Sequence, residues 1–189
     1  MGKLNSLTKF VTLLIGTIVI VAVWVTAVNA QAQLTENSKL ALNGIGPIRV
    51  GMTVDEASQA AGVRLVKGYA PPPPHGEFCS YFKPQVGLQG IGFMVTKGRI
   101  VRVDISNERV STIKGAKIGD TEEKIFSLYP GQIRVIKNPL SGRGNNLTFV
   151  PRDTVDSNYR LIFETGIERR VKRFRSGQLP QVEYIEGCS

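Results

Sequence analysis

The sequence lacks most of the residue sets that carry enzyme chemistry. Its 189 residues include one histidine, His75, and two cysteines that do not form a C-x-x-C pair. A metal site at His75 would need partner ligands that the sequence does not offer nearby. There is no G-x-S-x-G motif, and the glycine-rich segment 142–144 lacks the lysine and hydroxyl of a phosphate-binding loop. We therefore predict a non-enzymatic protein with no catalytic residues, no metal and no cofactor.

Acidic residues are also few relative to basic ones. The chain has 15 aspartates and glutamates against 24 lysines and arginines, which gives a formal net charge of +9. This balance favours an acidic protein, an anionic surface or a glycan as partner, although it is equally typical of an ordinary soluble surface. Nucleic acid is not expected, because the sequence contains no base-stacking module and is predicted to leave the cytoplasm.

The prediction of export depends on the N-terminus. Residues 1–30 carry only Lys3 and Lys9 as charges, followed by the apolar run 10–28 and small residues. This pattern is typical of a signal peptide, whereas the run is also about long enough to span a bilayer. Residues 1–30 are therefore either a signal peptide or an N-terminal membrane anchor. Both predict a periplasmic or extracellular protein, which an uncleaved segment would tether to the inner membrane.

The two cysteines predict a disulfide. Cys79 and Cys188 are an even pair in an exported chain, where thiols are oxidised. The bond would close a loop of about 110 residues and remove roughly 4–5 kcal/mol of unfolded-state entropy. We expect it to tie the C-terminus to the first half of the chain.

Residues 48–67 contain a clear helix signal. Thr53 and Glu56 form a T-x-x-E capping box, an apolar stripe follows at helical spacing, and Gly62 suits the C-terminal cap. The same order returns about seventy residues later, in 116–137. There Asp120 or Thr121 would cap a second helix. Its expected buried face consists of Ile125, Phe126 and Leu128.

Each helix is followed by four segments with strand patterns. Apolar and polar residues alternate within them, and glycine- or proline-rich loops separate them. The expected strands are 64–67, 79–84, 91–95 and 99–105, then 134–137, 147–151, 160–165 and 169–176, with a last strand at 182–187. The predicted fold class is α+β: two tandem repeats of a short helix and an antiparallel four-stranded meander, with both helices packed on one face of the sheet.

This order of helices and strands predicts where the parts of the exported chain begin and end. Residues 31–43 are polar and read as a tether. Residues 44–110 form the first predicted α+β repeat and residues 111–189 the second.

The [VI]-G-[MD]-T-x-x-[EK] helix start, followed by four strands, resembles one repeat of the β-lactamase inhibitor protein. It is similar as well to a small lipoprotein of the outer-membrane β-barrel assembly machinery. The resemblance implies this fold and a tendency to bind proteins through the sheet and loops. It does not imply β-lactamase inhibition, and no cysteine is placed for a lipoprotein anchor. The chain more closely resembles a family of small exported bacterial proteins that end in an acidic residue, glycine and cysteine, which implies no mechanism.

Two loops and one strand are the candidate partner surface. The loops follow the first strand of each predicted repeat, and the strand carries the densest basic cluster of the chain. Polyproline segments flanked by aromatic residues suit protein docking. Ordinary variable loops and a solvated sheet face are the alternatives. The candidate residues are Tyr69, Pro72, Pro73, His75, Arg143, Arg170, Lys172 and Arg173.

The functional prediction is an exported module that binds a protein of the cell envelope through sheet and loop surfaces. One alternative is an inhibitor of an exported enzyme. The other is a membrane-anchored structural or assembly accessory of the envelope, which would touch the membrane only through residues 10–28.

Overall fold

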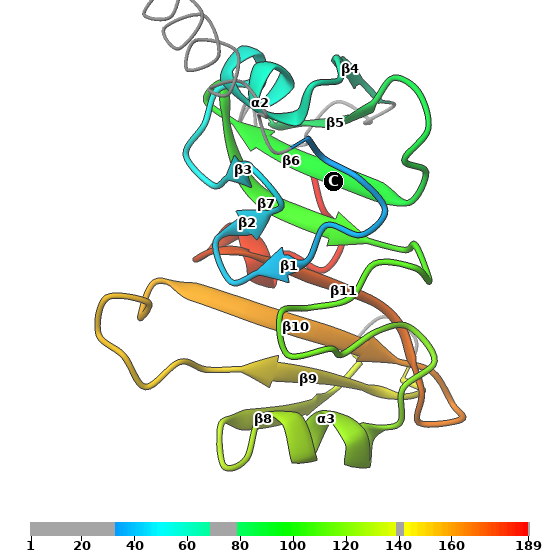
Figure 1. Cartoon of the computed structure of the whole chain (residues 1–189). Coiled ribbons are helices and arrows are strands. Elements are labelled where there is room, and N and C mark those ends of the chain that lie inside the picture. The colour runs from blue at the N-terminus through cyan, green and yellow to red at the C-terminus, as the bar shows by residue number, and fades with distance from the viewer. Residues whose placement is uncertain (1–32, 69–78, 139–141, 189) are drawn as a thin grey trace, which may run out of the picture. The chain divides into compact units, whose positions relative to one another are not determined.

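The computed structural model describes residues 33–68, 79–138 and 142–188 (Figure 1). Three predictions fall outside these residues: the signal peptide or anchor, the polyproline loop, and the candidate residues Tyr69, Pro72, Pro73 and His75. None of the helices in the described ranges is long and apolar enough to cross a membrane.

An eight-stranded antiparallel sheet dominates the structure. Its strands lie in the order β4-β5-β6-β7-β11-β10-β9-β8 (Figure 1). They are β4 (Leu65–Lys67), β5 (Cys79–Pro84), β6 (Ile91–Thr96), β7 (Arg99–Ile105), β8 (Ile133–Lys137), β9 (Asn145–Phe149), β10 (Tyr159–Thr165) and β11 (Val171–Gln178). The α+β class is confirmed. The strand segments predicted from the alternation agree with these strands to within a few residues, except for the last one.

The prediction of two four-stranded meanders in tandem is wrong, because the strands form one continuous sheet. β7 pairs with β11, which places Phe174 opposite Ile105 and Arg175 opposite Asp104. Each strand would otherwise present a row of unsatisfied N–H and C=O groups at an edge, and pairing satisfies both rows. The chain from residue 32 to 189 accordingly forms one compact unit rather than two.

The two helices begin where the capping residues indicate. α2 (Val54–Ala61) has the full Thr53–Glu56 capping box and ends at Gly62 in the left-handed conformation, with φ of 65°. α3 (Glu122–Leu128) is capped by the Thr121 side chain.

The expected buried face of α3 is wrong in one residue. Ile125 and Glu122 are fully buried, whereas Phe126 is 37% exposed. Consecutive helical residues point about 100° apart, so Phe126 cannot share the inward face of Ile125.

A second, three-stranded sheet was not predicted. It consists of β1 (Leu40–Ala41), β2 (Gly44–Ile45) and β3 (Ile48–Arg49). The prediction that residues 31–43 are a tether is therefore wrong for their described part. Leu34 and Leu40 are buried, and the Leu34 N–H donates to the Ala61 carbonyl at 3.0 Å. Two leucines were too few to show a period, yet each fills a place in the core.

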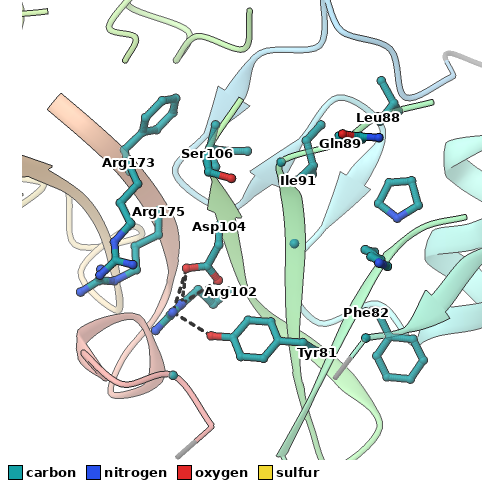
Figure 2. Close-up of a pocket in the computed structure, with 18 of the residues that line it drawn as sticks. Tyr81, Phe82, Leu88, Gln89, Ile91, Arg102, Asp104, Ser106, Arg173 and Arg175 are labelled. Atoms are coloured by element: carbon teal, nitrogen blue, oxygen red, sulfur yellow. Dashed lines mark hydrogen bonds and ion pairs between the residues drawn. The ribbon is translucent and has the colours of Figure 1, made fainter. Parts of the chain in front are cut away.

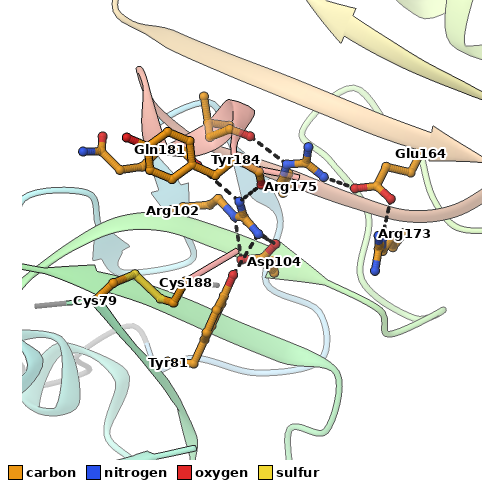
Figure 3. A network of polar contacts seen from close by, with 11 residues as sticks. Cys79, Tyr81, Arg102, Asp104, Glu164, Arg173, Arg175, Gln181, Tyr184 and Cys188 are labelled. Atoms are coloured by element: carbon orange, nitrogen blue, oxygen red, sulfur yellow. Dashed lines mark hydrogen bonds and ion pairs between the residues drawn. A yellow bond between two sulfur atoms is a disulfide. The ribbon is translucent and has the colours of Figure 1, made fainter. Parts of the chain in front are cut away.

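The two faces of the large sheet differ in what covers them. On one, the helix face, α2, α3 and the small sheet contribute Ala57, Ile125 and Ile45 to a single hydrophobic core with Phe93 and Phe163 of the sheet. The other, the tail face, carries Tyr81, Arg102, Asp104, Glu164, Arg173 and Arg175, and residues 181–188 lie over part of it (Figure 3).

The predicted last strand, 182–187, is wrong. The segment instead begins with a short 3₁₀ helix, η1 (Gln181–Glu183), which contacts β7, β10 and β11. β11 already has β7 and β10 on its two sides, so the following residues find no free sheet edge beside it and fold across the tail face.

Candidate functional site

The C-terminal tail is fixed to the tail face by a disulfide. Cys188 bonds to Cys79 of β5, with the two Cα atoms 5.5 Å apart, and the predicted pairing is confirmed (Figure 3). Under the bond lies a small apolar cluster of Met94 and Val101, against which Tyr81 packs. The disulfide therefore links the end of the chain to the first half of the sheet.

Arg102 joins the tail to the sheet from below. Its side chain is 5% exposed, and its Nε and Nη2 donate to the Asp104 carboxylate at 2.7–3.0 Å. Nη2 also donates to the Tyr81 hydroxyl at 2.8 Å. Nη1 donates to the tail carbonyls of Gln181, at 3.2 Å, and Tyr184, at 2.6 Å (Figure 3). These bonds use every nitrogen of the guanidinium, so Arg102 is a fixed structural centre.

Arg175 forms a second centre on β11. Its Nε donates to the Val182 carbonyl at 2.7 Å, and its Nη1 pairs with Glu164 of β10. Arg173 donates to the other oxygen of Glu164 from the solvent side. Glu164 and Arg175 are almost fully buried, whereas the Arg173 side chain is 54% exposed. One carboxylate thus serves two guanidinium groups, of which one reaches solvent.

The buried network perturbs the ionisation of its members. Burial, together with the negative charge of Asp104, raises the pKa of Tyr81 to about 12. Burial, together with the positive charge of Arg102, lowers the pKa of Arg175 to about 10. Near neutral pH, Tyr81 is therefore a neutral hydrogen-bonding group and Arg175 is a cation.

A groove of about 1010 Å³ is open on this face, beside the tail (Figure 2). Its floor includes Gly92 of β6 and the side chains of Tyr81 and Asp104. The loop 85–90 lines it on one side, and Arg173 of β11 together with residues 185–187 of the tail on the other. Tyr81, Asp104 and Arg173 belong both to the hydrogen-bond network and to the lining of the groove, which makes the groove the candidate functional site.

The structure separates the candidate residues that were predicted as one surface. Arg173 lines the groove. Arg170 donates to the Gly119 carbonyl at 2.8 Å, and Lys172 pairs with Glu168 at 3.7 Å, both away from the groove. Arg143 is exposed in the segment before β9 and does not line the groove either.

Sequence reasoning missed Tyr81, Arg102, Asp104, Glu164 and Arg175. The one local signal was the alternation in 99–105, where Arg102 and Asp104 interrupt an apolar strand. The five residues lie on β5, β7, β10 and β11, and they bond to one another and to the tail at separations that no local pattern records.

The groove carries groups that bind through charge and hydrogen bonds. Among the described residues, no three His, Cys, Asp or Glu side chains are grouped so as to hold a metal ion. Both cysteines are committed to the disulfide. The guanidinium of Arg173, the carboxylate of Asp104 and the phenol of Tyr81 are suited to recognising a polar ligand.

Comparison with known proteins shows distant likeness in fold alone. No protein-family model matches the chain, and no curated protein sequence matches it. The crystal structure of the uncharacterized protein yfeY from Escherichia coli is similar with a TM-score of 0.48 and 15% identity, over 74% of this chain and 99% of that one. An extracellular protein containing a SCP domain, from Bacillus anthracis str. Ames, is similar with a TM-score of 0.42 and 10% identity, over 69% of this chain and 44% of that one. Neither similarity is high enough to indicate a function.

Proposed function

We propose that this chain is an exported, non-enzymatic binding module that engages a protein of the cell envelope through the groove on its tail face. The observation that carries the proposal is the combination of a large open groove with charged walls held by a buried hydrogen-bond network. A surface that is already in its binding conformation favours association, because little ordering is then required.

The network supplies that preorganisation. Arg102 and Arg175 are held by Asp104, Glu164 and three tail carbonyls, so this part of the groove wall has little side-chain freedom to lose on binding. Ordering mobile side chains costs about 0.5–1.5 kcal/mol each on association, and a fixed wall avoids that cost. The volume of about 1010 Å³ is at the upper end of small-molecule pockets, and an open groove of this size suits a polypeptide segment better.

Two observations support the exported location. The Cys79–Cys188 disulfide belongs in an oxidising compartment. The first 30 residues have the charge and apolar pattern of a signal peptide or anchor. The resemblance of the helix start and the following strands to a repeat of the β-lactamase inhibitor protein supports a protein partner over a small molecule.

Site-specific photo-cross-linking in the producing cell tests the proposal. A photoreactive amino acid is placed at Gln89 or Ser106, which are exposed and line the groove. Matched control positions are Val155 and Ile167, which are 83% and 72% exposed and lie outside it. We expect the two groove positions to yield the same cross-linked envelope protein and the controls to yield none of it.

The result also separates the alternatives by the identity of the partner. An exported enzyme would indicate an inhibitor, and an assembly or structural protein would indicate an envelope accessory. Equal cross-linking from all four positions, or none from the groove, would refute the groove as the binding surface.

A further inference from the structure

The charges around the groove do not balance. Its lining includes four basic side chains and three acidic ones. The basic ones are Lys83, Arg102, Arg173 and Arg175, and the acidic ones are Asp104, Glu164 and Glu186. Among these described residues the basic side chains exceed the acidic ones by one.

The ion pairs show which cation shares its counter-charge with another. Arg102 is matched one to one by Asp104. Arg175 and Arg173 share Glu164, whose side chain is 5% exposed. Because Arg175 is buried and faces Glu164 and the tail, the half-exposed Arg173 is the member of this pair whose charge is only partly matched (Figure 2).

Arg173 also has donors to spare. Its Nε is taken by Glu164, whereas its terminal Nη1 and Nη2 donate no hydrogen bond to a residue that the structure describes. The two terminal nitrogens of a guanidinium form a planar fork that matches the two oxygens of a carboxylate. Glu164 holds the group from behind, so the fork is already oriented.

The groove floor beside it has room for a backbone. Gly92 lacks a side chain, and a Cβ added there would meet nothing closer than Asp104 Cβ at 3.9 Å and Tyr81 Cδ1 at 4.0 Å. An extended segment can therefore lie over Gly92, along the ring of Tyr81, with a side chain reaching Arg173.

We propose that the groove binds an acidic segment of the protein partner, with one aspartate or glutamate carboxylate paired to the terminal nitrogens of Arg173. This inference rests on the proposed function and specifies the ligand chemistry of the same site. A carboxylate is favoured over a phosphate, because a dianion would bring a second negative charge next to Asp104 and Glu164.

Peptide pools test the inference on the full chain. The probes are fluorescein-labelled, N-acetylated and C-amidated nonapeptides with glutamate at the centre and uncharged residues elsewhere. A second pool has glutamine at the centre, and a third has phosphoserine. Binding is followed by fluorescence anisotropy for the natural chain, for Arg173→Gln and for Lys172→Gln. Lys172 is the matched control because it loses the same charge one residue away, outside the groove.

The expected result is binding of the glutamate pool at least ~10-fold tighter than the glutamine pool, as hydrogen bonds to a charged group imply. Arg173→Gln should abolish that difference, and Lys172→Gln should change it less than ~2-fold. Equal affinity for the two pools, or equal effects of the two substitutions, would overturn the inference. Tighter binding of the phosphoserine pool would overturn the choice of a carboxylate.

Photo-cross-linking from Gln89 separates this inference from the proposed function. If Arg173→Gln retains the cross-linked partner in full, the groove is a binding surface but the carboxylate contact is wrong. If the natural chain gives no cross-link from the groove, the proposed function itself fails.

Discussion

Replacing Arg102 with methionine should strongly destabilise the fold. The side chain is 5% exposed and donates to the Asp104 carboxylate, the Tyr81 hydroxyl and the carbonyls of Gln181 and Tyr184. Methionine replaces the aliphatic stem of the side chain but offers no donor. All four acceptors then lose the guanidinium at once.

The magnitude follows from the burial of those acceptors. Removing one partner of a buried ion pair costs about 3–5 kcal/mol, because the other charge is left without compensation. The Asp104 side chain is 31% exposed, so water can hydrate its carboxylate in part. We therefore expect a loss of about 3 kcal/mol in the free energy of unfolding, at the lower end of that range.

Urea unfolding followed by circular dichroism, with the disulfide intact, measures the loss. The double substitution Arg102→Met with Asp104→Leu is the control, because it removes both charges and should recover much of the stability. Hydrogen exchange should speed up in the tail segment 181–185, which loses two anchoring bonds. A loss below about 1 kcal/mol for the single substitution would refute the central role given to Arg102.

Three further predictions concern the disulfide, a helix cap and the dependence of stability on pH in the alkaline range. Replacing Cys79 and Cys188 with serine should lower the free energy of unfolding by up to about 4–5 kcal/mol, since the bond spans 109 residues; urea unfolding that matches the oxidised chain would contradict this. Thr53→Ala removes one half of the capping box of α2 and should cost about 1 kcal/mol in thermal or urea unfolding, whereas no change would show that the cap is dispensable. Because the pKa of Tyr81 is raised to about 12 in the folded chain, an unfolded chain loses the phenolic proton first, and the stability that Tyr81 contributes should fall as pH rises above about 10. The lowered pKa of Arg175 acts in the opposite direction over this range, so the contribution of Tyr81 is read from the difference between the natural chain and Tyr81→Phe. Tyr81→Phe should flatten that fall in unfolding measured from pH 9 to 12, and should remove the late component of the absorbance titration at 295 nm; an unchanged titration would refute the burial of the phenol.

Local patterns were sufficient for the elements of this fold. The capping box of Thr53 and Glu56 gave the start of α2, and Gly62 gave its end. Alternation of apolar and polar residues located the strands of the large sheet, including β5 to the residue. Each of these signals lies within a few residues of the element that it describes, which is why one sequence is enough to read it.

The pairing of distant segments was beyond those patterns. Nothing near β7 or β11 indicates that Ile105 lies opposite Phe174. The C-terminal segment 182–187 alternates like a strand, yet its place is set by the sheet edges already taken and by Arg102 and Arg175, which capture its carbonyls.

The candidate site illustrates the same limit. Arg173 was singled out with Arg170 and Lys172 because the three stand together in the sequence. In the structure only Arg173 reaches the groove, where it meets Glu164, nine residues away across a hairpin. A basic cluster in the sequence indicated the strand but not which side chain faces the groove.

Filling the groove while keeping the fold tests the central claim most directly. Gly92→Phe places a ring over the groove floor, where the added Cβ has only ordinary van der Waals neighbours. Val155→Phe, at a position 83% exposed outside the groove, is the matched control. Capture of the cross-linked partner is compared for both variants after their thermal unfolding has been shown to match the natural chain. We predict that Gly92→Phe loses the partner and Val155→Phe keeps it; a correctly folded Gly92→Phe that still captures the partner in full would contradict the groove as the binding surface.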